Sequence, residues 1–158
     1  RGSEKVLLVD SNFRHPTLHD YMNIEMKKGL VELILGECTL EDVMKPTNVN
    51  NLKVITAGIH HSNPFSLLES APLEKLIEQM ELEADWVLFD SSPINLYSES
   101  VVLASKMDGI IMVIQSEKTR WQVAQEAKKR IVEGRGNVLG VILNRRKMYI
   151  PEWAYKLL

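Results

Sequence analysis

Five short, almost wholly apolar runs rich in β-branched residues constrain the fold of this chain more than any other feature. They occupy residues 6–9, 52–55, 86–89, 110–114 and 138–143. Such runs are typical of strands covered on both faces, because a parallel sheet carries helices above and below it. Segments with helical spacing of apolar residues separate the runs. The alternation predicts an α/β fold: a doubly wound, mainly parallel sheet of about five strands in a Rossmann-like arrangement of three layers.

Two of the intervening segments carry clear helix signals. Pro72 suits a first helical turn and is followed by apolar residues that share one helical face. Ser116 is a candidate N-cap for a later helix that buries Trp121 and ends at Gly134. We therefore expect a helix after each of these two residues.

Length and composition indicate one globular domain spanning residues 1–158. The formal net charge of −2 provides no general attraction to nucleic acid, so no nucleic-acid partner is expected. The single cysteine, Cys38, excludes an internal disulfide framework and suits a reducing, cytoplasmic compartment. The apolar runs are too short to span a bilayer.

Polar residues follow the apolar runs at the places where an open α/β sheet carries its function, the carboxyl ends of its strands. The first run is followed by Asp10, the third by Asp90 and the fifth by Asn144 and Arg145. Two converging carboxylates suit Mg²⁺, which takes few protein oxygens and keeps waters and phosphate oxygens. Arg14 and Arg145 could neutralise phosphate charge. These residues are the candidate site for a magnesium nucleotide.

One interpretation of the two aspartates is a phosphoacceptor receiver domain, in which Asp90 is phosphorylated beside an acidic Asp10. The spacing argues against it, because a complete strand and several helical segments separate the two residues. A receiver domain has room for one strand and about two helices there.

The other interpretation is a P-loop ATPase of the deviant Walker type. Residues 5–19 read KVLLVDSNFRHPTLH, and residues 85–93 read DWVLFDSSP. Further matches follow in order at Thr56-Ala57-Gly58, Asn63-Pro64, Asp108-Gly109 and Asn144. Over nearly its whole length the chain resembles the bacterial tyrosine kinases that govern capsule and exopolysaccharide export. In that family the first stretch is the second acidic motif, and the second stretch is the Walker B motif.

The resemblance implies an ATP-dependent tyrosine kinase-like ATPase that regulates capsule or exopolysaccharide biosynthesis, with Mg²⁺ and ATP as cofactors. By position, Asp10 would orient Mg²⁺ and help activate the attacking hydroxyl, Asp90 would hold a water on the metal, and Asn144 would contact the adenine edge. The implied partners are a membrane chain-length regulator or an adjacent kinase subunit, including a homo-oligomer. The implied location is the cytoplasmic face of the cell membrane.

The chain departs from the family pattern in three ways. It contains no Gly-x-x-x-x-Gly-Lys-Ser/Thr phosphate-binding loop, which in the family lies upstream of the first acidic motif. Either these residues are the C-terminal portion of a P-loop kinase domain, or the chain is a relative that has lost its nucleotide site, and we favour the first. In both cases we expect the chain to bind ATP weakly and to be weakly active or inactive by itself. Asn12 replaces the usual second aspartate, and Glu99 stands where the family commonly has aspartate.

Two other functions remain open at this stage. One is a non-catalytic interaction module of the same fold that binds a membrane chain-length regulator. The other is a partitioning-type ATPase, although Asn63-Pro64 followed by Leu67-Leu68 favours the exopolysaccharide family.

The missing loop also predicts a gap in the sheet, because the strand that feeds it would lie between the runs at 86–89 and 110–114. Unpaired backbone groups in a buried gap cost about 1–3 kcal/mol each. We expect the two flanking strands to close together, or a partner chain or another segment to fill the position.

Overall fold

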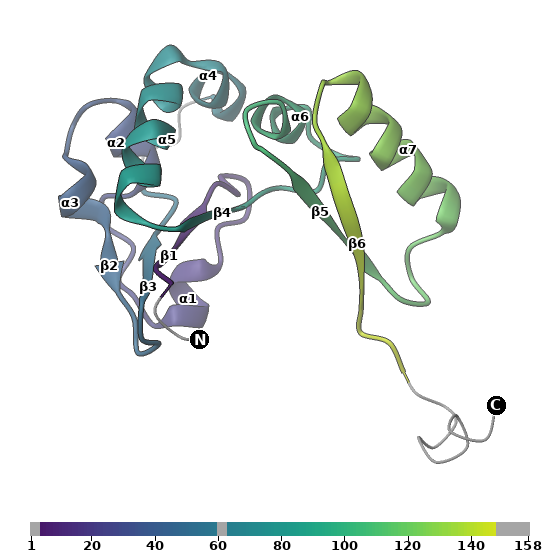
Figure 1. Ribbon diagram of the computed structural model, residues 1–158, viewed down its shortest axis with the longest axis horizontal. Helices are drawn as coiled ribbons and strands as arrows, with labels where there is room; N and C mark the ends of the chain where they lie inside the picture. Colours follow the sequence, from purple (N-terminus) through teal and green to yellow (C-terminus); the bar gives the residue numbers. More distant parts are fainter. Residues whose placement is uncertain (1–3, 60–62, 148–158) are drawn as a thin grey trace. The chain divides into compact units, whose positions relative to one another are not determined.

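The computed structural model describes residues 4–59 and 63–147, which form two compact units, Arg1–Leu103 and Ala104–Leu158. Figure 1 shows the elements of both units. The packing of the two units into one domain over residues 1–158 stays a prediction. None of the described helices has both the length and the apolar character that a membrane span requires.

The first unit contains a four-stranded sheet in the order β2-β3-β1-β4. Strands β3, β1 and β4 are parallel, and the short β2 is antiparallel to β3. The bounds of these strands are β1 Val6–Asp10, β2 Lys45–Pro46, β3 Leu52–Ile55 and β4 Trp86–Asp90. The central position of β1 explains why its apolar side chains are the most completely enclosed in the sheet, together with those of β3.

Five helices and the start of a sixth accompany this sheet: α1 Leu18–Met22, α2 Leu30–Ile34, α3 Leu40–Val43, α4 Pro64–Glu69, α5 Ala71–Glu83 and α6 Glu99–Ala104. Pro72 lies in the first turn of α5, as predicted. Helix α5 buries Leu73, Ile77 and Met80 at the spacing of one helical face. It contacts α2, α4 and β4, so its apolar face completes the core of this unit.

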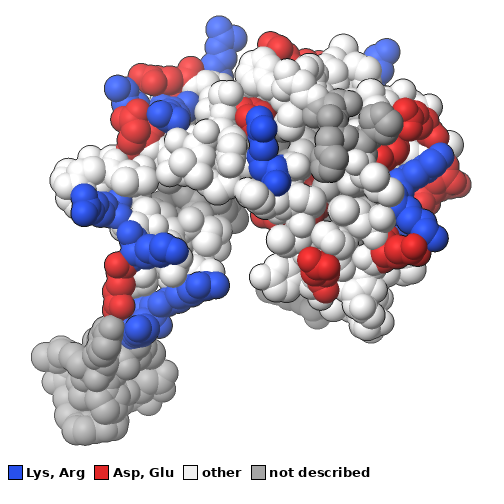
Figure 2. Space-filling view, turned by 180° about the vertical axis from the view of Figure 1, so that it is seen from behind, with Lys and Arg blue, Asp and Glu red and all other residues white. Residues whose placement is uncertain are grey.

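The second unit is a β-α-β element. Strands β5 (Ile110–Gln115) and β6 (Val138–Asn144) pair in parallel, and helix α7 (Trp121–Glu133) connects them. Helix α7 buries Ala127 and Ile131. On the face of the molecule in Figure 2, acidic and basic side chains are interspersed, in keeping with the small net charge.

The five predicted strands are all present within one residue of their expected bounds, which confirms the α/β class and the mainly parallel sheet. The prediction that Ser116 caps α7 is wrong. The N-cap is Arg120, and Ser116 opens a turn in which Glu117 adopts a φ of 62°. The backbone N–H of Ser116 donates to the carbonyl oxygen of Asn144 at 2.9 Å, and the turn that follows Ser116 separates it from the first residue of α7, Trp121.

The expectation that every strand is covered on both faces is also wrong. It holds for β1 and β3, but Trp86 and Leu88 of β4 are 58% and 48% exposed. Large apolar side chains of β5 and β6 are likewise open, namely Ile111, Val113, Leu139, Val141, Ile142 and Leu143. Trp121, expected inside, is 64% exposed. In β4 the exposed residues alternate with the half-buried Val87 and Phe89, so one face of this strand is left open among the described residues.

Strands β4 and β5, which flank the predicted gap, belong to different units, β4 to the four-stranded sheet of the first and β5 to the two-stranded sheet of the second. The first form of the gap prediction, that the two strands close together, stays a prediction. Its second form, that a partner chain or another segment pairs with them, stays a prediction.

Candidate active site

Asp10 and Asp90 lie side by side at the carboxyl ends of β1 and β4. They are register partners in the parallel ladder that also pairs Val9 with Phe89. Neighbouring strands lie about 4.8 Å apart, so the two backbones are as close as a sheet permits. The expectation that both carboxylates share one edge of the sheet is confirmed.

Asp10 is completely enclosed, with an exposed fraction of 0%. Its Oδ1 accepts the backbone N–H of Asn12 at 3.1 Å, and its Oδ2 accepts that of Leu18 at 3.2 Å. Burial raises the pKa of the Asp10 carboxyl, and the charge of Asp90 raises it further, against the lowering effect of the backbone hydrogen bonds. Asp10 therefore holds the start of α1 through its bond to Leu18, although burial disfavours its negative charge.

Asp90, in contrast, is exposed at the end of β4. Partial desolvation still raises the pKa of its carboxyl. Its carbonyl oxygen accepts two hydrogen bonds from Ser11, one from the backbone N–H at 2.8 Å and one from Oγ at 2.6 Å. The segment after β1 is thus tied directly to the end of β4, and the Asp90 carboxylate is the one that faces solvent.

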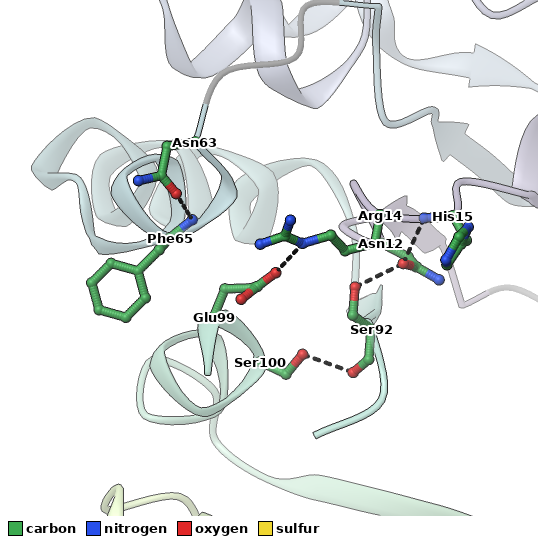
Figure 3. Close-up of polar contacts among 8 residues, drawn as sticks. All are labelled: Asn12, Arg14, His15, Asn63, Phe65, Ser92, Glu99 and Ser100. Carbon is green, nitrogen blue, oxygen red and sulfur yellow. Dashed lines mark hydrogen bonds and ion pairs between the residues drawn. The ribbon is translucent and has the colours of Figure 1, made fainter. Parts of the chain in front are cut away.

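Asn12 and Ser92 extend this connection between the two loops. The Ser92 hydroxyl donates to Oδ1 of Asn12 at 2.7 Å, and the same oxygen accepts the backbone N–H of His15 at 3.1 Å. The Ser100 hydroxyl in turn donates to the carbonyl oxygen of Ser92 at 2.7 Å. Figure 3 shows these contacts running from the loop after β1 to α6. Asn12 therefore joins the two loops through its amide oxygen.

Arg14 lies in the same loop but points toward α6. Its Nε donates to Oε1 of Glu99 at 2.7 Å, and its guanidinium carbon lies 5.1 Å from the centre of the Tyr97 ring. The Glu99 side chain is 5% exposed and that of Arg14 is 41% exposed. Arg14 is thus engaged by a buried carboxylate (Figure 3), and its expected contact with phosphate stays a prediction.

Asn144 and Arg145 lie in the second unit, at the end of β6. The Asn144 side-chain oxygen accepts the backbone N–H of Arg145 at 2.8 Å, and Arg145 adopts a φ of 55°. The structure therefore brings Asp10, Asp90 and Arg14 together in one unit and places the other two candidates as neighbours in the second. Their proposed contacts with adenine and phosphate stay predictions.

Sequence reasoning did not single out Ser11, Ser92, Ser100 or Tyr97 as parts of the site. The signal for Ser11 and Ser92 was available, because they follow the same strand ends as the aspartates. The sequence carries no signal for the partners of the serines, because each hydroxyl bonds to a residue in a distant part of the chain or to a backbone carbonyl.

The donor set fits a magnesium ion in part. Two carboxylates at one strand edge suit Mg²⁺, which binds through one or two carboxylates and keeps its remaining waters. Across residues 4–59 and 63–147 there is no group of three or more His, Cys, Asp and Glu side chains that could hold a metal. Asp90 is the exposed carboxylate of the two, and Asp10, its register partner on the adjacent strand, is enclosed.

Comparison with known proteins decides the family. No family model matches the chain. The tyrosine-protein kinase YwqD of Bacillus subtilis is 32% identical over 145 residues, covering 92% of this chain and 61% of YwqD. The solved kinase domain of VpsO is 31% identical, with a TM-score of 0.86, and the match covers 92% of this chain and 72% of that domain. The chain belongs to the bacterial tyrosine kinases.

The fold is P-loop NTPase-like. The septum site-determining protein MinD of Pyrococcus horikoshii, solved with Mg-ADP, superposes with a TM-score of 0.72 over 97% of this chain and 64% of its own. At 20% identity this likeness shows the fold alone. The chain spans about three fifths of the length of YwqD, so the activity of the whole kinase is proposed for it below and does not follow from the likeness alone.

Proposed function

We propose that these residues are the part of a tyrosine kinase catalytic domain that carries its two acidic motifs, acting in the control of capsule or exopolysaccharide production. Membership of the family supports the reaction class. The observation that carries the proposal is the register pairing of Asp10 with Asp90 at the carboxyl edge of the sheet.

The two aspartates have different roles in this proposal because their surroundings differ. Asp90 is open to solvent and would bind Mg²⁺ directly or through one of its waters. Asp10 is enclosed, so its charge would act on the metal from inside the protein, beside Asp90. Bound Mg²⁺ would supply charge neutralisation for the transferring phosphoryl group, which is where most of the catalysis in this class of reaction arises.

Asn144 and Arg145 would contribute from the end of β6, Asn144 to the adenine edge and Arg145 to phosphate charge. The partners in this proposal are an adjacent kinase subunit, which presents the tyrosine, and a membrane chain-length regulator, which places the chain at the inner face of the membrane. The competing function is an interaction module that keeps the fold without catalysis.

A chimera separates these two functions. The part of YwqD that precedes its match to this chain would be joined to Arg1, and phosphotyrosine formation with Mg-ATP would be measured on the chimera and on the chain alone. We expect phosphotyrosine from the chimera, its loss in Asp10→Ala and Asp90→Ala, and little or none from the chain alone, because the phosphate cradle is missing.

The interaction-module function makes the opposite prediction. A folded chimera that binds Mg-ATP in calorimetry and forms no phosphotyrosine would contradict catalysis. Micromolar affinity of the unfused chain for Mg-ATP would show that the nucleotide site lies elsewhere.

A further inference from the structure

Arg14 lies in the loop that follows Asp10, and its side chain already has two partners. Its Nε is bound to Glu99 at 2.7 Å, and its guanidinium group lies over Tyr97. If Arg14 bound a nucleotide phosphate, the phosphate would compete for its positive charge with Glu99, to which it is already paired. The geometry therefore favours another role for this side chain than phosphate binding.

Glu99 depends on Arg14 more than Arg14 depends on Glu99. The Glu99 side chain is 5% exposed, while that of Arg14 is 41% exposed. A buried carboxylate that loses its cation is left with an uncompensated charge, which is strongly unfavourable, whereas removal of both partners can be nearly neutral. Removal of Arg14 is therefore expected to cost more stability than removal of Glu99, because it leaves the buried carboxylate at the start of α6 unpaired.

The position of Arg14 in the chain links this pair to Asp10. Arg14 lies between Asn12 and Leu18, whose backbone N–H groups both donate to the Asp10 carboxylate. On the other side, Glu99 is followed by Ser100, whose hydroxyl bonds the carbonyl oxygen of Ser92 in the loop after Asp90. The ion pair therefore joins the loop after β1 to the start of α6, which the Ser100 bond ties to the loop after β4 (Figure 3).

We propose that Arg14 is a positioning residue, which holds the loop carrying the donors to Asp10 against the start of α6 through Glu99 and Tyr97. It does so without contacting the nucleotide. The consequence for phosphoryl transfer rests on the function proposed above, but the positioning itself does not. It is testable on the 158-residue chain without nucleotide.

The test is amide hydrogen exchange by NMR on Arg14→Leu, Glu99→Gln, the double variant and Arg14→Lys. In Arg14→Leu we expect the amides of Ser11, Asn12 and Leu18 to exchange at least about tenfold faster, with the amides of β3 unchanged, because the opening is local.

The companion variants separate positioning from general stability. Glu99→Gln should have a smaller effect than Arg14→Leu, and the double variant should exchange more slowly than Arg14→Leu because no buried charge is left unpaired. Arg14→Lys should restore part of the protection. The matched controls are Lys27→Leu and Glu25→Gln, which break a 2.9 Å ion pair whose two side chains are both 72% exposed.

Three results would overturn the proposal. The first is that the three amides exchange within about twofold of the wild-type rate in Arg14→Leu. The second is that exchange in Arg14→Leu accelerates equally throughout β3. The third is that Lys27→Leu accelerates exchange of the same three amides. If Arg14→Leu does not fold, Glu99→Gln alone decides by the same readout. A chimera without kinase activity would contradict the proposed function and leave this result standing.

Discussion

Asp10 and Asp90 are register partners on adjacent parallel strands, yet Asp10 has no exposed surface while Asp90 faces solvent. The pair is therefore asymmetric: one carboxylate is held by backbone donors inside the protein, and the other is available to a ligand. Burial raises the pKa of both. A cation placed at Asp90 would relieve the unfavourable charge of the two together.

The first prediction is that Asp90→Asn stabilises the chain near neutral pH. The folded-state pKa of Asp90 is raised above the ordinary value of 3.8. The folded state then binds more protons than the unfolded state between those two pKa values, so stability falls as pH rises through that window. Above it, the charged carboxylate is a net cost that the asparagine variant lacks.

Thermal unfolding in a chelator, measured between pH 3 and pH 8, checks this prediction. The melting temperature of Asp90→Asn should exceed that of wild type at neutral pH, and the two should converge at about pH 3.8 and below. A difference that is constant with pH, or that favours wild type at neutral pH, would be the contrary result.

The second prediction concerns Asn12, where the family usually has aspartate. Asn12→Asp keeps the acceptor for Ser92 and His15 but adds a negative charge beside Asp10. We expect a loss of about 1 kcal/mol of unfolding free energy without metal, equivalent to less than one pKa unit of repulsion. Added Mg²⁺ should restore it and should raise the melting temperature of this variant more than that of wild type.

Asn50→Asp is the matched control, since Asn50 is exposed and precedes β3, at the opposite end of the strands from the aspartates. Equal responses to Mg²⁺ in Asn12→Asp and Asn50→Asp would mean that Asn12 is not beside a metal site.

The third prediction is that the outer edge of β4 associates with another chain. Trp86 donates to Lys5 and Asp90 accepts from Ser11 on the β1 side, so the backbone groups of Val87 and Phe89 point to the outer edge. An open edge with exposed apolar side chains, here Trp86 and Leu88, is a template for strand pairing.

Sedimentation of the chain over a range of concentrations tests this. Concentration-dependent association that Trp86→Lys weakens is expected, and Val113→Lys reports whether β5 contributes as well. A monomer at every concentration, for wild type and both variants, would argue against pairing at these strands.

The sequence was sufficient for the strands and for the aspartate pair, because an apolar run followed by Asp is a local pattern with a direct structural consequence. It failed at Ser116, a residue type that often caps helices, because a turn follows it and α7 begins only at Trp121. It also failed where contacts join distant parts of the chain. The roles of Ser92 and Glu99 depend on partners some 80 residues away in the chain. The apolar residues of β4, β5 and β6 predict strands that can be buried, but the sequence does not show which segment or partner would bury the faces that are exposed here.

The most direct test of the central claim is paramagnetic broadening of backbone NMR signals by substoichiometric Mn²⁺, an oxygen-binding substitute for Mg²⁺. If the edge formed by Asp10 and Asp90 is the metal site, broadening will be strongest at Asp90, Ser91 and Asp10. It will be competed by excess Mg²⁺ and lost in Asp90→Asn. Broadening centred elsewhere, or unchanged in Asp90→Asn, would contradict the claim that these two strand ends form the metal site of a kinase.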